Sequence, residues 1–258
     1  MSHRILHALK TVANRSMAPL GIELANKRTH DWSDVRNFIP FESTIASAKK
    51  TGLAVGDYID NVMNKTPGAT QDAIDRLSKF GVFSGEIQTV VEIGPGSGRY
   101  LEKTLRACKP IRYEIYETAR DWARYVTERY GVLVQPTDGQ SLKATANDSA
   151  DLVQAHKVFS STTFMITSRY WVEIVRVTKP GGHVAFDLMT EACLGSEMLE
   201  ARGASGFNNG SYPSVMPRQV ALNYFQERGF LYLGGFFEPM PPGKTEMFVF
   251  RKLGDKVG

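Results

Sequence analysis

The sequence contains few cysteines and no long apolar run. Only two cysteines, Cys108 and Cys193, occur in 258 residues. The chain therefore offers neither a disulfide framework nor a cysteine-based metal cluster, and a cytoplasmic location is the simplest interpretation. No apolar stretch approaches the roughly 18 residues that a membrane-spanning helix needs. No N-terminal segment combines a long apolar region with a small-residue cleavage site, so the pattern does not predict secretion.

Outside the N-terminal segment, basic residues do not outnumber acidic residues. The net charge is +4, and residues 1–30 hold five Lys and Arg side chains against the single acid Glu23, so the remaining residues are neutral overall. Because no basic tract crosses the rest of the chain, we expect no nucleic-acid partner. Residues 3–18 carry apolar side chains at helical spacing, which favours a helix docked on the protein's own core. The alternative is that residues 1–20 lie on an anionic membrane surface, peripherally at the inner membrane.

What the sequence does contain is enough apolar residues for a large core, at 42%, and a change of pattern at residue 87. From there, expected strands alternate with expected helices. The strands are 88–93, 111–117, 132–135, 150–155, 182–188, 230–237 and 245–252. The helices are 98–107, 118–130, 167–178 and 214–228. The stretch KPGGH at 179–183 predicts a tight turn that leads into a strand.

This alternation predicts an α/β fold with a mainly parallel sheet covered by helices on both faces. The connection between the last two strands is too short for a crossover helix, so these two strands should pair antiparallel. Before the sheet, helical segments are expected within residues 41–63 and after Thr70. We therefore expect an N-terminal helical extension over residues 1–86 and one α/β domain over residues 87–258.

The stretch VVEIGPGSGRY, residues 90–100, reads as a buried strand that enters a glycine-rich turn. The dinucleotide fingerprint needs glycines at its first, third and sixth positions, but here they are Gly94, Gly96 and Gly98, and Arg99 stands at the sixth. Glu92 lies just before the turn, where its carboxylate would repel a pyrophosphate. S-adenosylmethionine has no phosphate and carries a sulfonium and an ammonium, so an acid at this place favours it over NAD.

Two further acids follow at the ends of expected strands. Glu117 comes 19 residues after Gly98, where an acid at a strand end binds a ribose diol. Asp138 follows the third expected strand, where an Asp can reach the amino group of adenine. Ligands of open α/β sheets bind at these strand ends. Each acid alone is weak evidence, but together with the glycine turn they predict an adenosine-containing cofactor.

The stretches VVEIGPGSG, YEIYE, PTDGQSL, ADLVQAHKVF and EIVRVTKPGGHVAFDL resemble the successive motifs of class I S-adenosylmethionine-dependent methyltransferases, over residues 87–252. The resemblance implies a Rossmann-like, doubly wound, seven-stranded sheet whose last strand is antiparallel, with S-adenosylmethionine as cofactor. The implied cofactor contacts are Glu92, Gly94, Pro95, Gly96, Ser97, Gly98, Glu117, Thr118, Asp138, Gly139, Gln140 and Ser141. The basic N-terminal segment and FIPFESTIASAKKTGLAVGDYID are similar to methyltransferases found beside glycosyltransferases in glycan and glycolipid pathways.

The sequence lacks the motifs of several acceptor classes. AHKVF follows the fourth expected strand, in place of the Asn/Asp-Pro-Pro-aromatic turn of amino-methylating nucleic-acid enzymes. Neither a Pro-Cys nucleophile nor a catechol-type Asp-Asp-Asn metal site is recognisable. We therefore predict a metal-independent O-methyltransferase for a small-molecule hydroxyl, above all a sugar in a saccharide or glycolipid. The alternatives are a polyketide or phenolic O-methyltransferase, and a non-catalytic protein that keeps the cofactor-binding fold.

Two residues are candidates for removing the acceptor proton. His156 ends the fourth expected strand, and an ordinary imidazole pKa near 6.5 suits a general base. Packing beside the cofactor is its structural alternative. Asp187 ends the fifth expected strand and is the competitor, with a capping role as its own alternative. Lids or acceptor walls are expected from Tyr58 and Gln71, and from Phe207 and Tyr212 in the long Gly/Asn/Ser-rich stretch 203–217.

Overall fold

The fold comes from a computed structural model, which describes residues 39–205 and 214–254. The helix expected over residues 3–18, the membrane contact of residues 1–20, and both Phe207 and Tyr212 lie outside these residues. Within them, no helix combines the length and apolarity that crossing a membrane would need.

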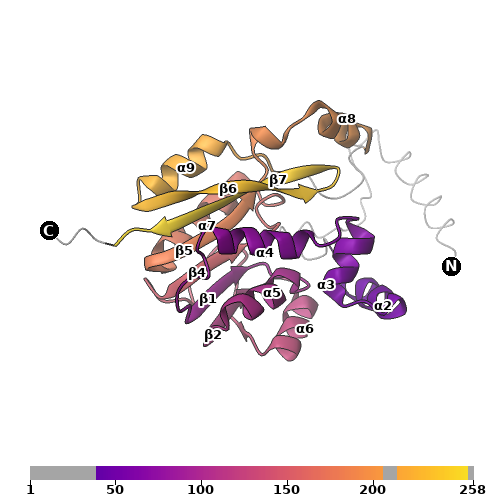
Figure 1. Cartoon of the computed structure of the whole chain (residues 1–258), viewed down its shortest axis with the longest axis horizontal. Helices are drawn as coiled ribbons and strands as arrows, with labels where there is room; N and C mark the ends of the chain where they lie inside the picture. Colours follow the sequence, from indigo (N-terminus) through magenta and orange to yellow (C-terminus); the bar gives the residue numbers. More distant parts are fainter. Residues whose placement is uncertain (1–38, 206–213, 255–258) are drawn as a thin grey trace, which may run out of the picture. The chain divides into compact units, whose positions relative to one another are not determined.

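A seven-stranded sheet forms the centre of the fold, with the strand order β3-β2-β1-β4-β5-β7-β6. All neighbours pair parallel except β7, which is antiparallel to both β5 and β6. Figure 1 shows β6 and β7 as a long hairpin. The strands are β1 (Thr89–Ile93), β2 (Arg112–Tyr116), β3 (Leu133–Val134), β4 (Ala150–Ala155), β5 (Thr178–Leu188), β6 (Phe230–Met240) and β7 (Gly243–Lys252). The expected doubly wound sheet with an antiparallel last strand is confirmed.

Helices cover both faces of the sheet. One core packs α7 and α9 against it, and the other packs α4, α5 and α6. Within the described residues, α2, α3, η3 and α4 precede the sheet, and η3 is a π-helix. The helices are α2 (Phe41–Thr51), α3 (Val55–Tyr58), η3 (Ile59–Met63), α4 (Ala69–Lys79), α5 (Arg99–Cys108), α6 (Arg120–Tyr130), α7 (Phe164–Val177), η4 (Glu191–Cys193), α8 (Ser196–Ser205) and α9 (Arg218–Gln226).

The two-residue alternation of each strand sorts its side chains between the two cores. In β1, Val91 and Ile93 join the core under α7, whereas Val90 joins the core under α4 and α5. The even-numbered residues of β1 therefore face α5. The same alternation governs the polar residues at the ends of the other strands, and it decides which of them meet.

Two elements differ from the sequence prediction. The stretch KPGGH is part of β5, which begins at Thr178, and the pairing with β4 shifts register between Ala150 and Leu152. Gly182 explains the difference, because a Cβ there would come within 2.9 Å of the carbonyl oxygen of Ala150. Backbone this close leaves no room for a side chain, so the glycine marks a bulge within the strand. Helix α8 was not predicted, because its apolar pattern is weak.

Candidate active site

The carboxyl ends of the parallel strands gather the expected site residues at one edge of the sheet. The strand order reverses between β1 and β4, and ligands of open α/β sheets bind at such a switch point. The glycine turn follows β1, Glu117 follows β2, Asp138 follows β3 and His156 follows β4. We call residues 94–98, Glu117 and residues 138–141 the glycine-loop side of this edge.

The three glycines of the turn have different surroundings. A Cβ on Gly94 would lie 2.7 Å from Val158 Cγ2, and one on Gly98 would lie 2.8 Å from Val126 Cγ1. These two positions are therefore closed by the protein's own packing. Gly96 has a φ of +51° and nothing within 4 Å of its Cβ position. Only Gly96 leaves its backbone open to a ligand, while Pro95 and Ser97 on either side are buried.

Glu117 joins the turn to the end of β2. Its carboxylate accepts hydrogen bonds from the backbone N–H groups of Gly96 and Ala119, each at 2.8 Å. Burial raises the pKa of Glu117, although these two donors oppose the shift. A carboxylate has about four acceptor positions, so two remain for further donors such as a ribose diol. Thr118 packs near the Cβ position of Gly139, at 3.4 Å, and so brings the ends of β2 and β3 together.

Asp138 closes its own turn. Its Oδ1 accepts from the backbone N–H of Gln140 at 3.1 Å and from the hydroxyl of Ser141 at 2.9 Å. Burial alone would raise the pKa of Asp138, but these hydrogen bonds lower it. The Lys143 ammonium lies 3.4 Å from Oδ2. The turn is thus held in place by residues within five positions of Asp138.

Glu92 does not line the open side of the glycine turn. It is 1% exposed, and its even-numbered position in β1 directs the carboxyl beneath α5, where the Tyr113 hydroxyl donates to it. Gln154 in turn donates to the Tyr113 oxygen at 3.0 Å. Burial raises the pKa of Glu92 to about 7, and the hydrogen bonds with Tyr113 and Gln154 oppose that rise. This enclosure could not be predicted from the sequence, because it depends on which face of the sheet α5 covers.

A second group of polar side chains lies buried at the same edge. We call it the buried edge cluster: Tyr100, His156, Lys157, Asp187 and Glu238. His156 is 5% exposed and its ring stacks on the Tyr100 ring, with centroids 4.1 Å apart. Neither ring nitrogen has a hydrogen-bond partner among the described residues. Burial lowers the pKa of His156 to about 3; Asp187 opposes the shift, and Lys157 and Arg99 add to it.

Lys157 connects the cluster. Its φ of +61° is a left-handed conformation, and its backbone N–H donates to Asp187 Oδ1 at 2.6 Å. Its ammonium lies 3.2 Å from Asp187 Oδ2, 2.8 Å from Glu238 Oε2 and 2.5 Å from the Thr245 hydroxyl. Burial would lower the pKa of Lys157, but the two carboxylates raise it above its ordinary value. Asp187 therefore anchors the turn that follows β4.

The N-terminal helices contact this edge through one buried ion pair. Asp60 of η3 is 2% exposed, and its Oδ1 lies 2.5 Å from an Arg99 guanidinium nitrogen. The guanidinium lies over the Tyr100 ring, 4.9 Å from its centroid. Tyr58, the last residue of α3, is half-buried. Gln71 is exposed and donates to Asp75 on its own helix, so the structure does not bring it to the buried edge cluster.

Sequence reasoning missed Tyr100, Lys157 and Glu238. Lys157 directly follows His156, so its place at a strand end was visible. No signal in the sequence marked Tyr100 or Glu238, because the first lies on a helix and the second lies just beyond the expected strand 230–237.

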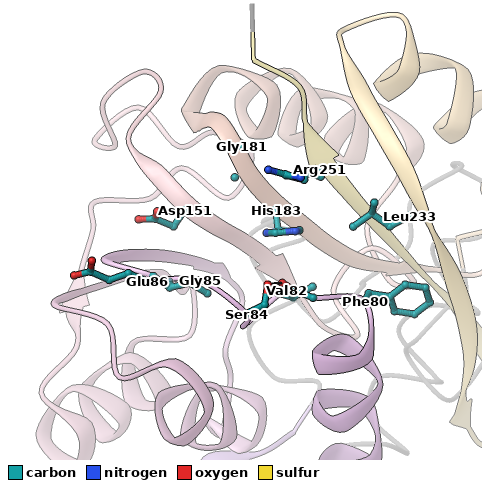
Figure 2. Close-up of a pocket in the computed structure, with 13 residues that line it drawn as sticks. Phe80, Val82, Ser84, Gly85, Glu86, Asp151, Gly181, His183, Leu233 and Arg251 are labelled. Carbon is teal, nitrogen blue, oxygen red and sulfur yellow. Dashed lines mark hydrogen bonds between the residues drawn. The ribbon is translucent and has the colours of Figure 1, made fainter.

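A pocket of about 330 Å³ lies elsewhere, at the amino ends of the strands (Figure 2). It is lined by the segment between α4 and β1, by Gly181, and by His183 and Arg251 of the paired strands β5 and β7. Because ligands of this kind of sheet bind at the carboxyl ends, we place the reaction at the opposite edge, among the residues described above. His183 lies in this pocket, away from the carboxyl ends of the strands.

Comparison with known proteins identifies the domain. Residues 91–186 match the family profile described as a methyltransferase domain. Residues 91–186 are therefore a methyltransferase domain. No curated protein sequence matches the chain.

Solved methyltransferases share the fold of this domain. An O-methyltransferase family protein from Burkholderia thailandensis has 18% identity and a TM-score of 0.54, covering 75% of this chain; the chain spans only 59% of that protein. The N-methyltransferase NodS from Bradyrhizobium japonicum WM9, in complex with S-adenosyl-L-homocysteine, has 16% identity and a TM-score of 0.53, covering 70% of this chain and 86% of its own. Magnesium protoporphyrin IX methyltransferase from Synechocystis PCC 6803 has 10% identity and a TM-score of 0.55, covering 71% and 81%.

The glycine-loop side of the methyltransferase domain fits S-adenosylmethionine. The open backbone at Gly96 permits close approach, which a side chain there would block. The spare acceptor positions of Glu117 suit the hydroxyls of a ribose. Both features belong to the described residues themselves, and they agree with a cofactor that lies across the ends of β1 and β2.

Proposed function

We propose that the chain methylates a hydroxyl group of a small molecule, specifically a sugar in a saccharide or glycolipid. The observation that supports this is the set of buried polar atoms without partners in the buried edge cluster. Both nitrogens of His156 and Oε1 of Glu238 lack a hydrogen-bond partner among the described residues. Such atoms are costly to leave unpaired, so a bound acceptor should supply their partners.

The chemistry of these atoms favours a polyhydroxyl acceptor. A neutral imidazole has one donor and one acceptor, and a carboxylate oxygen only accepts. The acceptor must therefore offer both hydrogen-bond donors and a hydrogen-bond acceptor within a small space. A hydroxyl group supplies both, and neighbouring hydroxyls on a sugar ring do so repeatedly. A fully protonated amine supplies donors only and would leave one nitrogen of His156 unpaired.

In this proposal the residues of the chain position the acceptor and exclude water. S-adenosylmethionine supplies an electrophilic methyl group. His156 stays neutral, because its pKa is about 3, so its ring can accept a hydrogen bond from one neighbouring sugar hydroxyl and donate to the oxygen of another, which orients the acceptor. Asp187 holds the Lys157 backbone and thereby fixes the turn that carries His156. Correct placement of two reactants can contribute several kcal/mol to a transfer reaction.

A turnover screen tests the proposal. The protein would be incubated with methyl-labelled S-adenosylmethionine and with methyl glycosides, glycolipids, phenols and primary amines. We expect transfer to a sugar hydroxyl. Transfer to phenols alone would favour a natural-product O-methyltransferase, and transfer to amines alone would contradict the proposal. Tight S-adenosylhomocysteine binding without turnover across broader panels would instead indicate a non-catalytic binding protein.

A further inference from the structure

Two buried carboxylates in the buried edge cluster share one cation. Asp187 and Glu238 are 0% and 3% exposed, and the Lys157 ammonium lies within 3.2 Å of the first and 2.8 Å of the second. The other nearby cation, Arg99, is already paired with Asp60. Two carboxylates that share one positive charge in a buried place cannot both be fully stabilised as anions.

The two carboxylates differ in how well they are held. Burial would raise the pKa of Asp187, but Lys157 lowers it through its ammonium and its backbone N–H. For Glu238, burial and the negative charge of Asp187 raise the pKa, and the contacts with Lys157 and Tyr100 only oppose that rise. Lys157 therefore stabilises the Asp187 carboxylate as an anion more strongly than it stabilises the Glu238 carboxylate.

Glu238 also has a free acceptor atom. Its Oε2 is fixed by the Lys157 ammonium at 2.8 Å and by the Tyr100 hydroxyl at 3.1 Å. Its Oε1 is buried and has no hydrogen-bond partner among the described residues. One oxygen thus sets the orientation of the carboxylate, and the other remains available for a ligand.

The strand pairing places Glu238 on the same side of the sheet as the candidate acceptor residues. Asp187 lies two residues after Ala185, which joins the core under α4 and α5, so it shares that face. On the hairpin, Glu238 lies two residues after Phe236 of that core and pairs with Thr245. All lie at the edge to which β4 brings His156, which stacks on the same Tyr100 ring that reaches Glu238.

We propose that Glu238 accepts the proton of the methyl acceptor at Oε1. This inference rests on the proposed function, transfer to a hydroxyl. His156 and Asp187 are both less suited: the first lies buried beside the cations Lys157 and Arg99, and the second accepts from the Lys157 backbone N–H and is ion-paired with the Lys157 ammonium at 3.2 Å.

The step balances without another reactant. The oxygen lone pair of the acceptor forms the new O–CH3 bond, while the S–CH3 bond breaks and its electron pair remains on the sulfur, which becomes a neutral thioether. The O–H bond of the acceptor breaks, and its proton moves to Glu238 Oε1, which becomes a neutral carboxylic acid. Glu238 releases this proton to solvent after the product leaves.

The test compares Glu238→Gln with Glu227→Gln, a matched change at an exposed glutamate just after α9. With methyl glycosides as acceptors, Glu238→Gln should lower kcat by about 10²–10⁴-fold and leave S-adenosylhomocysteine affinity within about 3-fold, since the glycine-loop side is untouched. The Glu227 variant should match the wild type. Unchanged cofactor affinity also shows that the Glu238 variant is folded.

A second measurement does not depend on turnover. Glutamate labelled with 13C at the side-chain carboxyl would be titrated by NMR in the complex with S-adenosylhomocysteine. The resonance that is missing in Glu238→Gln should titrate above the ordinary 4.5. Titration at or below 4.5 would overturn the assignment even in a protein with no detected acceptor. Full activity of Glu238→Gln on a hydroxyl acceptor would overturn the role of Glu238 and leave the proposed function standing. Exclusive transfer to amines would overturn the proposed function instead.

Discussion

The two parts of the carboxyl edge differ in where their polar groups find hydrogen-bond partners. On the glycine-loop side, most polar groups find partners close by in the sequence: Asp138 accepts from Ser141, and Glu117 accepts from Ala119 and also from Gly96, which is 21 positions away. In the buried edge cluster, partners come from far apart, and the hydrogen bond between Tyr100 and Glu238 joins residues 138 positions apart. The first part is nearly complete by itself. The second leaves buried atoms unpaired, which is expected where an acceptor binds.

The two parts of the edge also differ in how their buried polar groups are held in place. Glu117 is held by two backbone N–H groups, one beside it in the sequence and one in the glycine turn after the adjacent strand β1. Lys157, Asp187 and Glu238 are held by one another and by the hairpin. Changes in the buried edge cluster should therefore affect both stability and turnover, whereas changes on the glycine-loop side should act mainly on cofactor binding.

The largest effect is expected for Lys157→Met. This change leaves two buried carboxylates without their shared cation and should lower the free energy of unfolding by about 3–5 kcal/mol. Urea denaturation measures the loss. A loss of less than about 1 kcal/mol in the free energy of unfolding would mean that water reaches the buried edge cluster. The two parts of the edge would then not differ in how they stabilise their charges.

A pH-dependent effect is expected at Glu92. Its pKa is raised from 4.5 to about 7 in the folded state, so the folded protein holds a proton that the unfolded chain has lost. Its contribution is complete below pH 4.5 and disappears as the pH rises through about 7, at most about 3 kcal/mol. Glu92→Gln keeps an acceptor for Tyr113 and should remove this dependence.

Urea denaturation of the wild type, Glu92→Gln and the exposed control Glu86→Gln at pH 5 and pH 8 checks this. The stability of Glu92→Gln relative to the wild type should rise between the two pH values, while Glu86→Gln should follow the wild type. Parallel behaviour of all three proteins would show that the Glu92 carboxyl is solvated and available to the glycine turn.

The next effect concerns His156. His156→Ala should lower kcat by about 10²-fold, with little change in S-adenosylhomocysteine affinity. Since its pKa is about 3, the pH profile should keep whatever near-neutral ionisation the wild type shows. The loss of such an ionisation would restore His156 as the base that its ordinary pKa suggested from the sequence. A loss of cofactor affinity with unchanged kcat would mean that His156 contributes to cofactor binding, as the glycine-loop side does.

A smaller effect should separate ligand contact from backbone strain. Gly96 and Gly131 have φ values of +51° and +68°, and neither has an atom within 4 Å of its Cβ position. Gly96→Ala and Gly131→Ala should thus lower the melting temperature similarly. Only Gly96→Ala should weaken S-adenosylhomocysteine binding, by about 10-fold, as measured by calorimetry. Equal affinities would mean that the open backbone at Gly96 does not face the cofactor.

The smallest effect is expected for Lys143→Ala. The Lys143 side chain is 81% exposed and lies 3.4 Å from Asp138, and exposed pairs of this kind contribute little. Stability and S-adenosylhomocysteine binding should change by about 0.5 kcal/mol or less. A larger loss of binding would show that the Asp138 turn depends on Lys143 and not on its own hydrogen bonds.

Much of the fold could be predicted because local patterns carry it. The strand–helix alternation and the short β6–β7 connection predicted the sheet and its antiparallel last strand. The start of β5 was misread, since Lys179–His183 looks like a turn locally, whereas the backbone of Ala150 makes it a bulged strand. Helix α8 has too weak an apolar pattern to be found.

The sequence by itself determined the glycine turn, Glu117 and Asp138, because a strand, a tight turn and the following helix are neighbours along the chain. Only the tertiary structure decided that Glu92 is enclosed under α5, that the imidazole of His156 is buried and its pKa lowered, and that Lys157 joins Asp187 to Glu238. The physical reason is that burial and charge depend on which elements pack together. Pairing between distant strands, and the helix that covers them, set the pKa of each side chain more strongly than its neighbours in sequence do.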